Sequence, residues 1–94
     1  DFTAAPDWES VQDDDKKVLI ETYQRRSGGE APTAEVALDI YNRAMVVWLG
    51  GRPEASDEEW DSFRENMETT FKRTFSQAEL EKYYGRYLLE FLGR

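Results

Sequence analysis

The 94-residue chain contains neither cysteine nor histidine, and both absences limit the chemistry open to it. Without cysteine, disulfides and thiolate metal sites are excluded. Without histidine, the chain lacks the usual general base, the commonest metal ligand and the usual pH switch near neutrality. We therefore expect a protein that is not an enzyme and holds no metal or cofactor. The lack of cysteine leaves its compartment open.

Long hydrophobic runs are also missing, and so is an excess of positive charge. No apolar run approaches the roughly 20 residues needed to cross a bilayer, and no segment has the pattern of a signal peptide. The net charge of −8 would repel nucleic acid and anionic membranes. We expect a soluble protein that binds neither of them directly.

Aromatic residues are plentiful at 14%, and hydrophobic residues make up 39% of the chain. A chain of this length and composition is typical of one small globular domain. No stretch alternates like a strand, whereas apolar residues recur at helical spacing. We predict an all-α fold with one domain, residues 1–94, in which an irregular or short-turn lead-in at 1–12 precedes four helices at about 13–26, 34–49, 57–74 and 77–92.

Helix start signals are sharp in the second half of the chain. Ser56 with Glu59, and Ser76 with Glu79, have the spacing of capping boxes, in which each side chain satisfies a free backbone amide. Thr33 is a plausible N-cap for the helix after it. Pairs of glycines follow the first two predicted helices and indicate where these helices stop.

Each predicted helix has an apolar face. The second helix is apolar over more than half its circumference, which favours a central position. The last two helices have narrower stripes at spacings of three and four, and we expect the stripe of the fourth helix to be core. Their residues are Trp60, Phe63, Met67 and Phe71 in the third helix, and Leu80, Tyr84, Tyr87, Leu88 and Phe91 in the fourth. Gly85 interrupts the fourth helix, either for a close helix approach or as a tolerated defect.

Carboxylates are the one abundant reactive group. Glu65 and Glu68 have a spacing that could share a metal ion, but helical di-metal sites also use a Glu-x-x-His motif that this chain lacks. We interpret them as a solvated acidic face. The three aspartates at 13–15 fit the first turn of a helix better than a calcium loop.

Charge is distributed unevenly, with acids concentrated at 54–68 and a net positive segment at 72–94. Acidic patches speed association with basic partners. Leu89 is predicted to lie opposite the core stripe, where flanking lysine and arginine side chains would suit an acidic surface. The residues that we predict to bind a partner are Asp57, Glu58, Asp61 and Glu65 on the third helix, and Lys82, Arg86 and Leu89 on the fourth.

Three functions are compatible with this pattern. The first is a non-catalytic protein–protein interaction module, such as an adaptor, a regulatory subunit or an inhibitory or immunity-type protein, whose acidic patches would suit a basic partner. The second is an acidic nucleic-acid mimic that inhibits a DNA- or RNA-binding protein. The third is a small-ligand carrier with an aromatic pocket between helices. Homo-oligomerisation stays open. An exposed apolar patch rimmed by charge would favour the first, an uninterrupted row of carboxylates the second, and an enclosed apolar cavity the third.

Overall fold

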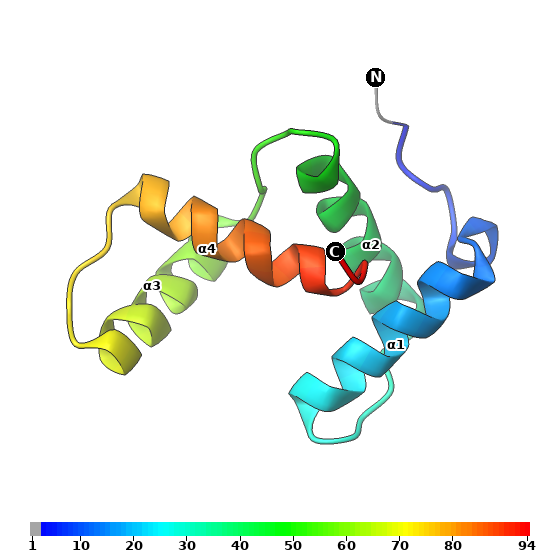
Figure 1. The fold of residues 1–94 in the computed structure, drawn as a ribbon, viewed down its shortest axis with the longest axis horizontal. Coiled ribbons are helices and arrows are strands. Elements are labelled where there is room, and N and C mark those ends of the chain that lie inside the picture. The colour runs from blue at the N-terminus through cyan, green and yellow to red at the C-terminus, as the bar shows by residue number, and fades with distance from the viewer. Residues whose placement is uncertain (1–2) are drawn as a thin grey trace.

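The computed structural model describes residues 3–94, which form one short 3₁₀-helix and four α-helices (Figure 1). The elements are η1 (Trp8–Ser10), α1 (Asp13–Ser27), α2 (Ala34–Trp48), α3 (Asp57–Phe71) and α4 (Gln77–Glu90). No strand occurs within these residues. The predicted single all-α domain with four helices is confirmed. Of the predicted lead-in, residues 1 and 2 lie outside the described residues.

The last two helices are shorter than predicted. α3 ends at Phe71 rather than near residue 74, because Lys72 adopts a left-handed backbone conformation with φ of 55°. α4 ends at Glu90 rather than at residue 92. The amides of Phe91 and Leu92 there donate to carbonyls only three residues back, both at 3.0 Å, which tightens the last turn.

The predicted N-caps are confirmed in atomic detail. The Ser56 hydroxyl accepts a hydrogen bond from the Glu59 amide at 3.1 Å, and the Glu59 carboxylate accepts one from the Ser56 amide at 3.0 Å. Ser76 and Glu79 repeat both bonds. The Thr33 hydroxyl accepts from the amide of Val36 at 3.2 Å. These bonds satisfy amides that the helices themselves cannot use.

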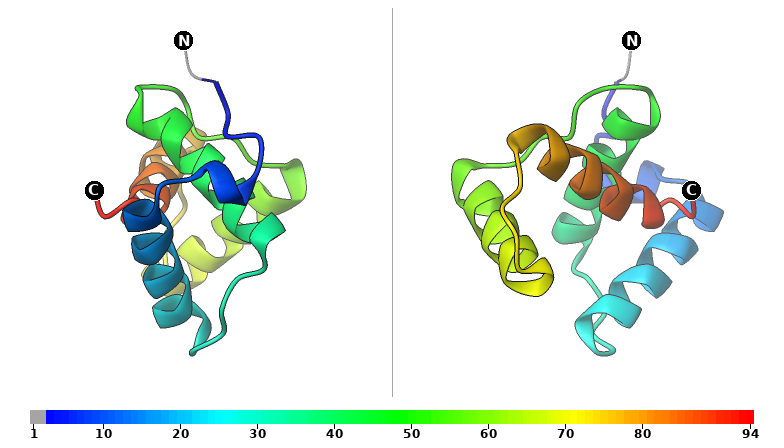
Figure 2. Two further views of the ribbon diagram at one scale, coloured as in Figure 1. Left: turned by 90° about the vertical axis from the view of Figure 1, so that its right-hand side faces the viewer. Right: turned by 60° about the vertical axis from the view of Figure 1, so that its left-hand side comes forward.

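The core lies where α4 crosses α2, with α1 packed beside them (Figures 1 and 2). One cluster joins Leu19 of α1 to Ala37 of α2 and to Phe91, next to the end of α4. A second cluster joins Ala44 of α2 to Leu88 of α4 and to Leu92. The wide apolar face of α2 therefore has the central position that its composition predicts.

The lead-in is pinned to this core. Asp7 caps η1 by accepting a hydrogen bond from the Ser10 amide at 2.9 Å. Val11 is buried and Trp8 packs against the cluster around Leu19. Before η1, the amide of Ala5 donates to the Asn42 side chain at 2.9 Å, so the chain that precedes η1 lies against α2.

Helix α3 stands apart from the rest of the domain. It lies beside α4 and is separated from α1 in Figure 1 and in the right-hand view of Figure 2. None of its residues is buried, and Phe71 is 56% exposed, so its apolar stripe is only partly covered. The radius of gyration is 13.7 Å, whereas a compact chain of this length would have about 12.4 Å. The domain is open on the side of α3.

Removing either cap should destabilise the domain. Ser56→Ala and Ser76→Ala each leave an amide at a helix start without its partner, so each should lower the free energy of unfolding by about 1 kcal/mol. Urea denaturation followed by circular dichroism would measure the change. Ser62→Ala, at an exposed position within α3, is the matched control. Midpoints that match the control for both cap variants would contradict the capping-box assignment.

Substitution of Gly85 should preserve or raise stability, in contrast to loss of the caps. This glycine is buried, and a Cβ atom placed on it would lie 3.4 Å from Cγ1 of Val47 in α2, which is ordinary van der Waals contact. Alanine favours helix over glycine by about 1 kcal/mol. Gly85→Ala should therefore leave thermal stability unchanged or raise it by up to about that amount. A clear loss of stability would mean that α2 and α4 need a closer approach than the structure shows.

Candidate aromatic groove between α1 and α3

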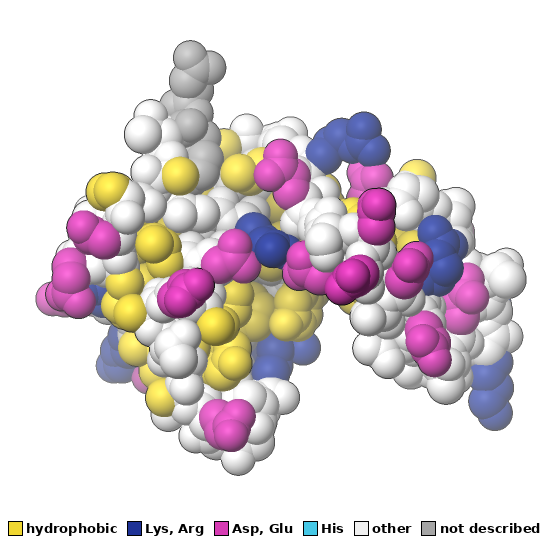
Figure 3. All heavy atoms as spheres, turned by 180° about the vertical axis from the view of Figure 1, so that it is seen from behind, with side chains coloured by type: hydrophobic (Ala, Val, Ile, Leu, Met, Phe, Trp, Pro, Cys, Tyr) yellow, Lys and Arg dark blue, Asp and Glu magenta, His cyan; other side chains and the backbone are white. Residues whose placement is uncertain are grey.

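An open groove runs between the C-terminal end of α1 and α3, with α4 as its floor. It consists of two adjoining hollows of about 560 and 680 Å³ that share residues from all three helices. We call it the aromatic groove and define it by six side chains: Phe63, Met67 and Phe71 of α3, and Tyr83, Tyr87 and Leu89 of α4. Figure 3 shows, from behind, hydrophobic side chains in the recess between the α1–α2 part and the α3 part.

The wall on α3 follows from the spacing of its apolar stripe. Phe63, Met67 and Phe71 recur every four residues, so they share one face of the helix. This face looks partly toward α4 and partly into the groove, because no further helix covers it among residues 3–94. The stripe is therefore a partly exposed surface.

A run of aromatic contacts holds this wall against α4. The ring of Tyr84 packs edge-on against Trp60 and Phe63, with centroids 5.2 and 5.3 Å apart. Tyr84 also stacks on Tyr87 at 5.8 Å. These rings fill the space between α3 and α4, so the opening lies at the side of the aromatic cluster and not inside it. Burial raises the pKa of the Tyr87 phenol above its usual value.

Arg26 sets the opposite wall. Its guanidinium forms an ion pair with Glu90 of α4 and lies over the ring of Tyr87, 4.7 Å from the centroid. The hydroxyl of Thr22, which is buried, donates to the backbone carbonyl of Glu90 at 3.4 Å. These contacts tie the end of α1 to α4 and fix the width of the groove.

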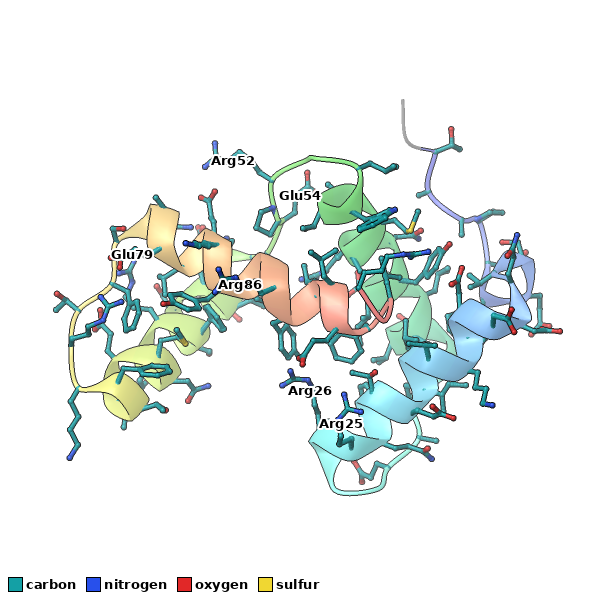
Figure 4. The ribbon with its side chains drawn as sticks, viewed as in Figure 1. Arg25, Arg26, Arg52, Glu54, Glu79 and Arg86 are labelled. Atoms are coloured by element: carbon teal, nitrogen blue, oxygen red, sulfur yellow. The ribbon has the colours of Figure 1, made fainter. Side chains whose placement is uncertain are left out.

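Arginines also stand along the rim. Arg86 lies over the Tyr83 ring at 5.8 Å, and Arg94 over Trp48 at 4.7 Å. Neither guanidinium forms a salt bridge with any residue between 3 and 94, whereas Arg26 is paired. Figure 4 shows Arg26 below α4 and Arg86 on α4 itself. The groove thus has basic groups available at its edge in a protein of net charge −8.

The structure brings together three of the seven predicted partner-binding residues. Arg86 and Leu89 line one hollow of the groove, and Glu58 lines the other. Leu89 is half-buried and also packs against the cluster around Leu88. Glu65 and Lys82 are exposed and line neither hollow.

The remaining two predicted residues, Asp57 and Asp61, line a separate polar hollow of about 1250 Å³ on another face of α3. Arg52 reaches across this hollow to Glu81 at 2.7 Å, and this pairing holds the pKa of the Glu81 carboxyl below its usual value. Figure 4 shows Arg52 and Glu54 on the loop at its edge, away from the aromatic groove. Asp57 and Asp61 therefore belong to a different site from Arg86, Leu89 and Glu58.

Reasoning from the sequence missed most of the groove. Arg26 was assigned to the last turn of a helix, Tyr87 to the core, and Phe63 and Met67 to an apolar stripe without a binding role. One signal could have indicated the groove: the short link between α3 and α4 makes these two helices neighbours, and one neighbouring helix covers only part of an apolar face.

The paired acids Glu65 and Glu68 do not form a joint site. Glu65 is exposed, whereas the Glu68 carboxylate accepts a hydrogen bond from the amide of Phe75 at 3.1 Å and lies 3.8 Å from Arg64. Over the part of the chain that the structure describes, no three carboxylates gather closely enough to hold a metal ion together. None of the helices formed by residues 3–94 is both long and apolar enough to span a bilayer.

Comparison of the chain with protein-family models, with curated proteins and with solved structures found no match.

Arg43 of α2 holds the N-terminal end of α3 in place. Its guanidinium forms ion pairs with Asp39 at 3.1 Å and Glu59 at 2.8 Å, and donates to the Tyr84 hydroxyl at 3.4 Å. The hydrogen bond from Arg43, followed by that from the Ser56 amide, lowers the pKa of Glu59 to about 2. Glu59 is therefore both a helix cap and a link between helices.

This lowered pKa predicts a pH dependence. Glu59 should stabilise the fold fully above its unfolded pKa of about 4.3, and this contribution should be lost as pH falls toward 2. Its side chain is 44% exposed, so solvent screening limits the effect to about 1 kcal/mol or less. Glu59→Gln should reduce the loss of stability between pH 5 and pH 2, measured by urea denaturation. Glu58→Gln is the control, and an equal change in both variants would contradict the assignment.

Proposed function

We propose that the protein is a non-catalytic protein–protein interaction module that binds its partner through the aromatic groove. The observation that carries this proposal is an exposed apolar groove rimmed by charge, on a domain that otherwise has a filled core. Contiguous exposed apolar surface of this kind marks binding sites, because isolated domains gain stability by covering it. The proposal includes adaptor, regulatory and inhibitory functions, which share this mode of binding.

The composition of the groove suits a protein interface. Tyrosine, phenylalanine, methionine and arginine are the residues enriched at the centres of such interfaces. Tyr83, Tyr87 and Phe71 supply large rings, and Met67 supplies a side chain that adapts to the shape of its partner. Arg86 can form bidentate bonds with a carboxylate of the partner.

The other two functions have weaker support. The acidic faces are interrupted by ion pairs, such as Arg73 with Glu79 at 3.1 Å and Arg52 with Glu81 at 2.7 Å. Such interruptions disfavour imitation of a phosphate row. The aromatic groove is open along its side and the space between α3 and α4 is filled by Tyr84, so a small ligand would stay largely in contact with water.

Groove variants test the proposal in cells or native lysate. The purified protein and each variant would be used for capture under identical conditions, with the bound proteins identified and quantified by mass spectrometry. A partner that uses the groove should be retained by the unaltered protein and reduced about tenfold or more by Phe71→Ala, because aromatic anchors dominate interface energies. Leu49→Ala is the matched control, since Leu49 is 57% exposed and lies outside the groove.

The same experiment separates the alternatives. Identical sets of captured proteins for the unaltered protein, Phe71→Ala and Leu49→Ala would contradict the proposal. Capture of a nucleic-acid-binding protein that is lost with Asp57→Asn and Asp61→Asn, but kept by Phe71→Ala, would favour the nucleic-acid mimic over the groove-binding module. The 56% exposure of Phe71 makes its truncation compatible with folding, which thermal denaturation would verify.

A further inference from the structure

Resting on that proposed function, we infer that the aromatic groove takes an amphipathic α-helix of a partner protein whose polar flank is acidic. The inference names the shape and the charge of the segment that binds. It follows from three features of the groove. These are its length along α3, the hydrogen bonds already made by the backbone around it, and the positive sign of the side-chain charge at its rim that has no ion-pair partner.

Length and spacing fit a helix of about four turns. The groove follows α3, whose 15 residues span about 22 Å. Along it, Phe63, Met67 and Phe71 form a row with helical periodicity. A second helix laid beside this row could interleave apolar side chains at i, i+4 and i+7 with it. The bound helix would also touch Tyr87 on the floor and would give α3 the second neighbour that it lacks.

The backbone around the groove favours a helix over an extended segment. The walls and floor are α-helices, whose amides and carbonyls are already paired with one another, and residues 3–94 present no strand edge. An extended peptide buried there would lose water from its own amides and gain no backbone partner. A helix arrives with its backbone hydrogen bonds already made.

The molecule as a whole exposes more surface than a compact protein of its mass. Its accessible surface is 6370 Å², whereas a compact protein of this mass would expose about 5,600 Å². The side of α3, a helix in which no residue is buried, contributes to this open surface.

The charge that is left over in the groove is positive at its α4 edge. Glu59 is held by Arg43, and Glu90 by Arg26. The Arg86 guanidinium lies over the Tyr83 ring and forms no ion pair or side-chain hydrogen bond with residues 3–94, so it is available for a carboxylate. Glu58, at the far end on α3, is the one lining acid without such a pairing among residues 3–94. An acidic flank facing Arg86 therefore complements the groove, whereas a basic flank would meet like charge.

Three synthetic helical peptides of about 15 residues test the inference. The acidic probe has leucine at alternating spacings of three and four, glutamate on its polar flank, and a side-chain staple that holds the helix. The basic probe replaces every glutamate with lysine. The permuted probe has the acidic composition, but its leucines do not form a stripe. Fluorescence anisotropy at low and high salt would give each affinity.

We expect the acidic probe to bind about tenfold or more tightly than either of the other two, and less tightly as salt rises. Arg86→Glu should reduce its affinity about tenfold and shift the preference toward the basic probe. Lys17→Glu is the matched control because it makes the same charge change at an exposed position of α1 outside the groove. Phe71→Ala should weaken binding of the acidic probe, and Leu49→Ala should not.

Several outcomes would overturn the inference. These are equal or tighter binding of the basic probe, equal binding of the permuted probe, or the same response to Arg86→Glu and Lys17→Glu. A dimer seen by sedimentation velocity and lost in Phe71→Ala would assign the groove to a second copy of this chain. If no probe binds but Phe71→Ala still abolishes capture of a native partner, the helical occupant is wrong and the proposed function stands. If the groove variants change neither the binding of the probes nor the capture of a native partner, both the inference and the proposed function are wrong.

Discussion

Helices α2 and α4 cross at positions where both have small residues, and this crossing positions the rest of the domain. Ala44 of α2 is fully buried, and Gly85 of α4 is buried where a Cβ atom would be in ordinary contact with Val47. Small residues on both sides bring the helix axes near each other, so the larger side chains around them can interlock. The cluster around Leu88 includes Ala44 at this crossing, and the cluster around Leu19 joins α1 to α2 and to Phe91 after the end of α4.

Helix α3 depends on that crossing only indirectly. Its start is attached to α2 through Arg43 and Glu59, and its side rests on the tyrosines of α4. Its far end is held by the following turn, where Arg64 donates to the carbonyl of Phe75 and Glu68 accepts from the amide of the same residue. These contacts fix the position of α3 without covering its apolar side. The result is a firmly placed wall with exposed rings, which is a useful arrangement for binding because little order has to be gained when a partner arrives.

The net charge of the molecule and the local charge at the groove differ in sign. At long range the net charge of −8 dominates and would steer basic partners toward the protein. Within the groove, the carboxylates near the arginine rim are already paired, and the local sign is reversed. Contact at the groove therefore selects a different charge from the one that the whole molecule attracts. A partner with an acidic helix on an otherwise basic surface would satisfy both.

The sequence by itself determined the helices, because their signals are local. A capping serine and a glutamate three residues later interact within one turn, so Ser56, Ser76 and their partners could be read without knowledge of the fold. Helix ends were less certain, since Lys72 left the helical conformation in a segment where no glycine or proline marks a stop. Arg86, Leu89 and Glu58 were found as candidate residues because their positions on a helical face are also local. Only the tertiary structure decided that Phe63, Met67 and Phe71 line a groove. Periodicity shows that a face is apolar, but how far it is covered depends on how many neighbouring helices pack against it. Among residues 3–94, α3 has α4 along its side and meets α2 at its start.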